Sequence, residues 1–305
     1  MRVLPASAAL CTNDRARACF LRACALDVAV RKPGNVSQGS PGHRMQAEMF
    51  IASSEAAAGP LFRSGARVGA RIEAAVMASF AAAGCNTNLG ILLLCAPIAL
   101  AIERRPDATT PAALRAAIGA VLADLDLADA QGAYRAIALV EPGGLGTVAT
   151  EDVRRPPSVD LRAAMAIAAP RDAVARQYRD GYADLFDVGL AALGKGFSLT
   201  SGSVSERPDA ACTAAVQRLY LTLLGRFADS HIVRIHGEAL AHIVMTAAQA
   251  WMARAGPIDA LDNDPEFARW DARLKADRIN PGTTADLTVA TLLIAGLSDA
   301  SWHGS

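Results

Sequence analysis

Three aspartates are spaced so that they could hold a divalent cation. Residues 171–193 read as one helix, in which Asp180, Asp184 and Asp187 stand at positions i, i+4 and i+7. That spacing places all three carboxylates on one helical face, where they repel one another unless solvent or a cation bridges them. Oxygen ligands of this type suit Mg²⁺. The alternative is a solvated acidic stripe paired with arginine, because Arg176 precedes Asp180 by four residues.

A rigid polar turn near the end of the chain offers a second kind of site. It reads Asn280-Pro281-Gly282-Thr283-Thr284-Ala285-Asp286-Leu287 and leads into an apolar helix. Proline fixes one backbone angle, glycine frees the next, and either threonine can cap the helix. The free N–H groups and the dipole of a helix N-terminus favour anions, so this turn is a candidate phosphate site. Its simpler interpretation is an ordinary capped helix.

Five other breaks between apolar helices carry compact polar groups. They are Lys32–Val36, Gly84–Gly90 with Asn86 or Thr87 as a cap, Glu141–Gly146, Asp229–His231 and Arg234–Glu238. Each could be ordinary turn chemistry. Together with the turn at 280–287 they predict helix ends that converge on a polar ligand, with His231 able to orient a phosphate or a ribose hydroxyl.

Several familiar catalytic motifs are missing from the sequence. His236, Glu238 and His242 do not have the spacing of a zinc-protease helix. The glycine-rich loop at 143–146 lacks the Lys-Ser/Thr of a P-loop, and no strand–GxGxxG–helix unit or Gly-x-Ser-x-Gly occurs. These observations disfavour zinc-protease, Walker, Rossmann and serine-hydrolase sites.

The composition predicts a globular protein with a large core and small-molecule partners. Of the 305 residues 52% are hydrophobic, and 30 basic residues balance 30 acidic ones. No net charge therefore favours nucleic acid or an anionic membrane, and the apolar run at 91–102 is too short to span a bilayer. Six cysteines without a CxxC pair are typical of reduced thiols, so we expect a cytoplasmic protein.

Helical periodicity prevails almost throughout the chain. It predicts helices over 14–30, 46–58, 66–83, 88–103, 111–128, 160–168, 171–193, 209–228, 235–254 and 284–297. The only short strand candidates are 137–140 and 197–199. Because no internal repeat or long linker divides the chain, we expect one all-α domain over residues 1–305, with polar helix ends converging on a pocket.

In their order along the chain, these motifs resemble the triphosphoribosyl-dephospho-coenzyme A synthase family. The resemblance spans about residues 20–297 and includes Arg171-Asp172 and Gln177-Tyr178 besides the polar breaks. It implies an all-helical enzyme that transfers the triphosphoribosyl part of ATP to the 2′-hydroxyl of 3′-dephospho-coenzyme A and releases adenine. Such a glycosyl transfer builds positive charge on the ribose and negative charge on the leaving base, so it needs a carboxylate, a donor for adenine and Mg²⁺ on the triphosphate.

The resemblance implies roles for residues of this chain. Asp286 and Glu141 are the candidates to act on the sugar, and Asp184 and Asp187, with Asp180, are the candidate Mg²⁺ ligands. The candidate nucleotide and phosphate contacts are Lys32, Asn35, Asn86, Thr87, Asn88, Arg171, Asp229, His231, Arg234, Asn280, Gly282, Thr283 and Thr284. Among them, the arginines match phosphate geometry in a bidentate manner.

Two segments differ from the branch of the family that serves citrate lyase. Asn88-Leu89 replaces a His-Lys pair, and Arg44 stands where that branch has an acid. The chain looks closer to a branch from archaea and one-carbon-metabolising bacteria. Two alternatives therefore stay open: a related enzyme acting on another nucleotide- or pterin-like precursor in tetrahydromethanopterin-linked metabolism, and a non-catalytic nucleotide-binding protein. A homodimer is one option for the assembly.

Overall fold

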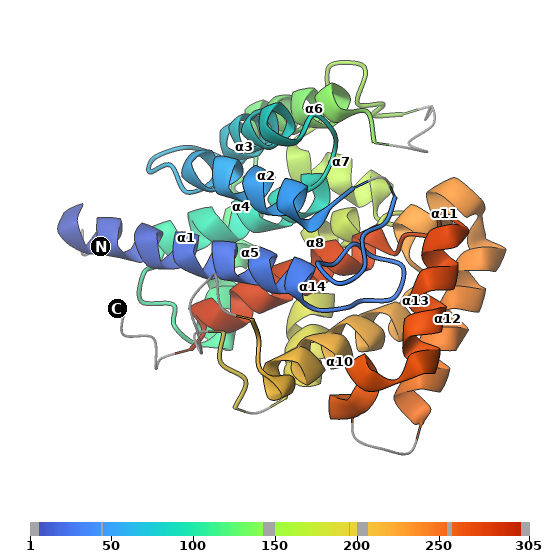
Figure 1. Ribbon diagram of the computed structural model, residues 1–305. Coiled ribbons are helices and arrows are strands. Elements are labelled where there is room, and N and C mark those ends of the chain that lie inside the picture. The colour runs from blue at the N-terminus through green and yellow to red at the C-terminus, as the bar shows by residue number, and fades with distance from the viewer. Residues whose placement is uncertain are drawn as a thin grey trace.

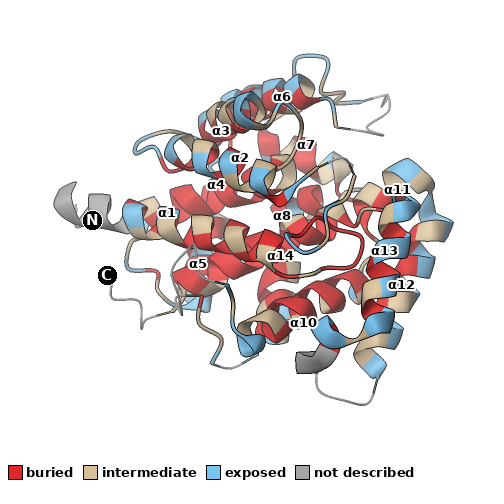
Figure 2. Cartoon of the chain, in the orientation of Figure 1, coloured by how far each residue is buried: buried red, intermediate tan, exposed pale blue. Residues whose placement is uncertain are grey.

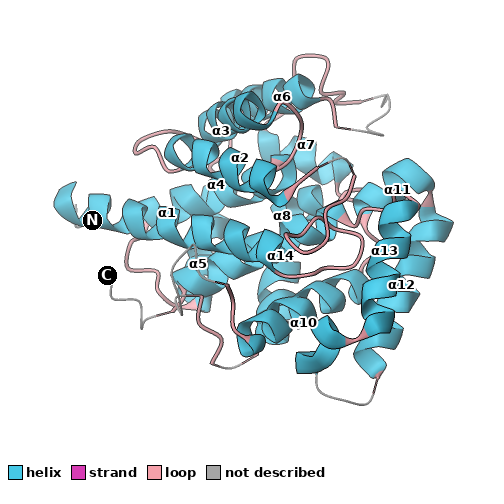
Figure 3. Ribbon diagram, in the orientation of Figure 1, coloured by secondary structure: helices cyan, strands magenta, loops and turns pink. Residues whose placement is uncertain are grey.

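The computed structural model describes residues 6–43, 45–142, 150–194, 196–199, 207–254 and 258–299 (Figure 1). Within these ranges the chain forms fourteen α-helices, a π-helical segment and a 3₁₀ segment, and no β-strand (Figure 3). The all-α prediction is confirmed. The elements are α1 (Ala6–Ala29), α2 (Ala47–Leu61), α3 (Val68–Ala83), α4 (Leu89–Arg104), α5 (Pro111–Ala123), α6 (Leu127–Val140), α7 (Leu161–Ala168), α8 (Ala173–Asp180), η1 (Asp184–Gly189), α9 (Leu190–Leu193), α10 (Ala210–Arg226), α11 (Ser230–His236), α12 (Glu238–Ala253), η2 (Ile258–Asn263), α13 (Pro265–Ala276) and α14 (Gly282–Leu297).

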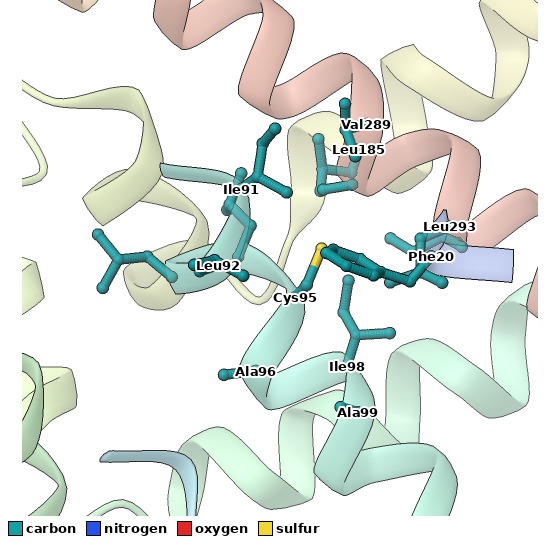
Figure 4. Packing of buried hydrophobic residues seen from close by; sticks show 14 of the residues in the cluster. Phe20, Ile91, Leu92, Cys95, Ala96, Ile98, Ala99, Leu185, Val289 and Leu293 are labelled. Atoms are coloured by element: carbon teal, nitrogen blue, oxygen red, sulfur yellow. The ribbon is translucent and has the colours of Figure 1, made fainter. Parts of the chain in front are cut away.

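Two apolar helices, α4 and α14, form the centre of the molecule. Every residue of α4 from Ile91 to Ile102 is buried, and α14 is buried along most of its length (Figure 2). A helix that is apolar on all sides must be surrounded by other helices, and α4 and α14 contact each other and α1. Figure 4 shows Cys95 and Ile98 of α4 within this cluster, together with Phe20, Leu185, Val289 and Leu293.

A layer of α2, α3 and α6 covers one side of this centre (Figure 1). Helices α3 and α6 approach closely at two glycines, since a Cβ on Gly69 would lie 2.5 Å from the Cα of Asp129, and one on Gly132 would lie 2.6 Å from the oxygen of Gly69. Asp129 also forms a capping box with Asp126 that starts α6. The predicted strand at 137–140 is wrong, because these residues complete α6.

Helices α10 to α13 enclose a second, smaller hydrophobic cluster. Its centre is aromatic: Trp251 stacks on Trp270 with ring centroids 6.1 Å apart, and Phe267 packs edge-on to Trp251 at 5.1 Å. Helix α13 was not among the predicted helices, although Asp264 caps its first turn and Pro265 occupies its first position.

The helix predicted over 171–193 is interrupted. Helix α8 ends at Asp180, and Gly181 and Tyr182 both take left-handed backbone angles, with φ of 64° and 62°. The chain then resumes as η1 and α9, which do not continue α8 as one helix. The strand candidate at 197–199 is also wrong, because these residues form no strand. None of the described helices combines the length and apolar composition that a bilayer-spanning helix needs.

Candidate active site

The predicted convergence of polar helix ends on a pocket is confirmed. A cavity of about 480 Å³ lies where the N-terminal ends of α4, α8, α11 and α14 meet the turn that follows α1. Ten of the predicted site residues line it: Asn35, Asn86, Thr87, Arg171, His231, Arg234, Asn280, Gly282, Thr283 and Asp286. The volume suits a nucleotide-sized ligand.

Asp286 supplies the carboxyl group at the floor of the cavity. Among the described residues none donates a hydrogen bond to it or pairs with it. The backbone of α4 passes directly in front, since a Cβ on Gly90 would lie 2.1 Å from the Asp286 Oδ2 atom. Burial, and next the negative charges of Asp27 and Asp229, raise the pKa of Asp286 well above its usual value. Asp286 is therefore a carboxyl group that binds a proton more strongly than an ordinary aspartate does.

The N-terminus of α14 already holds an anion, the carboxylate of Asp229. Its Oδ2 atom accepts hydrogen bonds of 2.7 Å from both the backbone N–H and the hydroxyl of Thr284, while its Oδ1 atom accepts from the N–H groups of His231 and Ile232. One buried carboxylate thus caps α11 and α14 together. The expectation that Thr283 or Thr284 caps α14 through its own side chain is wrong, because Asp229 takes that role.

The turn after α1 packs against the turn before α14 and forms one wall. Asn35 donates a 3.0 Å hydrogen bond to Asn280, and both side chains line the cavity. Gly34 adopts φ of 81°, and a Cβ there would lie 2.7 Å from Pro281. Lys32 stands behind this wall, fully buried, with its Nζ 2.9 Å from Asp27 and 2.6 Å from Asn35. Lys32 therefore does not line the pocket, contrary to its predicted phosphate contact.

Basic side chains gather on the side of the cavity formed by α8, α11 and α13. Arg234 is held by Asp172 at 2.9 Å and lies 3.4 Å from the Nδ1 atom of His231. Burial and the neighbouring Arg234 lower the pKa of His231 to about 4, so its imidazole is neutral at pH 7. Arg171 and Arg278 are exposed, and neither guanidinium pairs with a described carboxylate. These two arginines are cations available to a ligand.

The remaining wall is mostly apolar and comes from α4, α6 and α7. Leu89, Ile137 and Met165 contribute to it. Tyr134 also lines this wall and donates a 2.9 Å hydrogen bond to Glu151. A planar base or another apolar group fits such a surface.

Asn88, although predicted as a ligand contact, has a structural role. It is buried and donates to the hydroxyl of Ser53 at 2.7 Å. Glu141 ends α6 with φ of 40° and is exposed, and it does not line the cavity, although Pro142 does. The glycine-rich loop at 143–146 lies outside the described residues, as does Arg44.

The structure does not bring Asp180, Asp184 and Asp187 together. The break at 181–182 ends their common helical face, and each pairs with a different arginine. These pairs are Arg179–Asp180 at 2.7 Å, Arg176–Asp184 at 2.8 Å and Arg115–Asp187 at 2.6 Å. None of the three lines the cavity, and the described residues contain no cluster of three or more His, Cys, Asp or Glu side chains suited to a metal. The alternative of arginine-paired surface carboxylates fits this arrangement.

Sequence reasoning missed Asp27, His43 and Arg278, which line the cavity. Asp27 lies in the apolar stretch 23–30, where a single acid carries no local signal. Arg278 precedes the Asn280 turn by two residues and has φ of 58°, a constraint that the sequence does not reveal.

Comparisons with known proteins agree with the all-α fold. A model of the ATP:dephospho-coenzyme A triphosphoribosyl transferase family matches residues 13–305. A crystal structure from Archaeoglobus fulgidus, of a protein provisionally described as a triphosphoribosyl-dephospho-coenzyme A synthase, superposes with a TM-score of 0.61 at 22% identity, covering 83% of this chain and 99% of that one. At that identity the likeness supports the fold alone. A comparison with curated protein sequences finds no match.

Proposed function

Because the chain belongs to the ATP:dephospho-coenzyme A triphosphoribosyl transferase family, we propose that its cavity is where ATP and 3′-dephospho-coenzyme A react, and that Asp286 acts on the sugar. The observation that carries the assignment is the unpaired Asp286 carboxyl at the floor of a pocket whose rim is basic. A perturbed carboxyl group in such a place is typical of a catalytic acid or base.

The reaction forms one bond at the ribose C1′ atom and breaks another. The 2′-hydroxyl oxygen of the acceptor bonds to C1′, and the electron pair of the N-glycosidic bond leaves with adenine. Asp286 in its ionised form accepts the hydroxyl proton, and adenine takes up one proton as it leaves. Overall, one proton moves from the 2′-hydroxyl of dephospho-coenzyme A to adenine. Because the raised pKa of Asp286 makes it a better proton acceptor, this position suits a general base.

The triphosphate fits the basic side of the cavity. Arg171 and Arg278 have no carboxylate partner among the described residues, so they can pair with phosphate oxygens without breaking an ion pair. Arg234 is oriented by Asp172 and can add a third contact. Neutral His231 can hydrogen-bond to a phosphate or ribose hydroxyl at pH 7.

Mg²⁺ belongs in this proposal as a partner of the ATP triphosphate. The three predicted aspartate ligands do not fit a metal site, since each is engaged by an arginine away from the cavity. Mg²⁺ is commonly held through substrate phosphates with one or two carboxylates, which requires no protein cage. We assign it no ligand from Asp180, Asp184 or Asp187.

The Asp286→Asn variant tests this assignment. We expect it to lower kcat for adenine release by about 100-fold or more, with little change in KM for ATP, because the amide keeps the size of the side chain but cannot accept the proton. The ascending limb of the pH–rate profile should also disappear. Adenine is quantified chromatographically with ATP, Mg²⁺ and dephospho-coenzyme A present.

The matched control is Asp107→Asn, which removes an exposed carboxylate paired with Arg105 and should leave kcat unchanged. If Asp286→Asn keeps the kcat and pH profile of the parent protein, Asp286 is not the base.

A further inference from the structure

We infer that Asp27 is a second catalytic carboxylate, paired with Lys32 in the pocket wall, and that it stabilises positive charge on the ribose. The inference rests on the proposed function and assigns roles within the same site. It gives Lys32 a positioning role in place of direct phosphate contact.

The two residues form a buried pair at the edge of the cavity. Asp27 lines the cavity and is 4% exposed, whereas Lys32 is completely buried behind it. The Lys32 Nζ atom lies 2.9 Å from Asp27 and 2.6 Å from Asn35, and it stands 5.8 Å from the ring centroid of Tyr220. Since Lys32 does not line the cavity, Asp27 is the member of the pair that faces the ligand.

A short chain of contacts fixes this pair relative to the floor of the site. Tyr220 donates a 2.8 Å hydrogen bond to the carbonyl of Pro33, which holds the turn after α1. Asn35 then joins Lys32 to Asn280, six residues before Asp286. These contacts hold Lys32 in a fixed place in the wall of the cavity. Asp27 cannot move away from the cavity without breaking its ion pair with Lys32.

The surroundings of the two carboxyl groups differ in a way that separates their roles. Burial raises the pKa of Asp27, but Lys32 opposes that shift, whereas Asp286 has no cation in contact with it. The pKa of Asp27 is therefore raised less strongly than that of Asp286, and the negative charge of Asp27 contributes to the raised pKa of Asp286. When the surroundings of two nearby acids push their pKa values apart in this way, one acid serves as the proton carrier and the other as a fixed anion.

A fixed anion suits glycosyl transfer because the ribose ring becomes positively charged as the bond to adenine breaks. An ionised carboxylate in a water-poor wall interacts strongly with that charge, and it needs no rearrangement during the reaction. The expected consequence is selective binding of a cationic sugar over a neutral one.

The test compares two ligands that differ in charge at the sugar ring. One is an iminoribitol 5-triphosphate, protonated at the ring nitrogen, and the other is ribose 5-triphosphate. Calorimetry should show that the parent protein binds the cation at least about tenfold more tightly. Asp27→Asn should abolish the preference, whereas Asp286→Asn should retain it, because the Asp27 carboxylate and its contact with Lys32 are still present in that variant.

Variants of Lys32 test the positioning role. Lys32→Met should weaken the preference, and Lys32→Arg should restore most of it. The double variant Asp27→Asn/Lys32→Met removes both charges, so that no unpaired charge is left buried. Its preference for the cationic sugar should match that of the single Asp27→Asn variant. Arg71→Met is the control, since it also removes a fully buried cation, paired with Glu103 outside the cavity, and should keep the preference.

Failure of this inference is distinguishable from failure of the proposed reaction. If the parent protein shows no preference for the cation, or if Asp27→Asn keeps it, the role of Asp27 is wrong whatever the reaction. If the preference depends on Asp27 but dephospho-coenzyme A yields no adenine, the proposed acceptor is wrong and the role of Asp27 stands.

Discussion

At the residue scale, the position of the Asp286 carboxyl depends on a neighbour that has no side chain. Gly90 in the first turn of α4 faces Asp286, and a Cβ on Gly90 would lie 2.1 Å from Oδ2 and 2.5 Å from Cγ. Such an approach is far below van der Waals contact, so the carboxyl must move if the glycine is replaced.

We predict that Gly90→Ala lowers kcat for adenine release by about 100-fold, because a displacement of the base by about 1 Å has an effect of this size. Circular dichroism should report an unchanged helical content. Gly119→Ala in α5 is the matched control, since nothing lies within 4 Å of its added Cβ. That change should leave kcat intact and stabilise the helix by up to about 1 kcal/mol. Equal activity in the two variants would contradict the account of Gly90.

Residues of the site could be predicted from sequence where polar groups interrupt apolar helices. Asn35, Arg171, Asn280 and Asp286 were found in this way, and all four line the cavity. Asp27 could not be found, because one acid in the apolar stretch 23–30 has no local signal and its pairing with Lys32 depends on tertiary packing.

At the scale of elements, Asp229 joins the starts of two helices that carry the site. Its two oxygens accept hydrogen bonds at the N-terminus of α11 and at that of α14. A cap of this kind contributes about 0.5–2 kcal/mol to the stability of each helix. Without the carboxylate, backbone N–H groups at the start of both helices would be left without an acceptor.

We predict that Asp229→Ala lowers the free energy of unfolding by roughly 1–4 kcal/mol, the sum of two caps. Asp209→Ala, which removes the single exposed cap of α10, should cost about 1 kcal/mol. Urea unfolding monitored by circular dichroism measures both values. If the two variants lose equal stability, Asp229 does not hold two helices.

Most of the elements were predictable, but α6, α11 and α13 were not among the predicted helices, and the break after α8 was not expected. Helix α13 has a strongly polar surface, and its apolar residues, Phe267, Trp270 and Leu274, face only the small aromatic cluster. The break after α8 was missed because Gly181 alone is tolerated in a helix, and nothing about Tyr182 signals a left-handed residue. That break is what separates the three aspartates.

At the scale of the whole molecule, the cavity lies where the two hydrophobic clusters meet. Helices α4 and α8 belong to the larger cluster, while α11 and the turn after α13 belong to the smaller one. Helix α14 contributes to both, with Ala285 in the smaller cluster and Leu287 in the larger. Asp286, between these two residues, is therefore held by the packing of both parts.

The transfer of a triphosphoribosyl group is the central claim, and the product tests it most directly. The purified protein is incubated with ATP, Mg²⁺ and 3′-dephospho-coenzyme A, and the mixture is analysed by mass spectrometry with chromatographic measurement of adenine. We predict a new species with the combined mass of both substrates less adenine, formed in equal amount to the adenine released. Adenine without that species, or neither product, would contradict the claim.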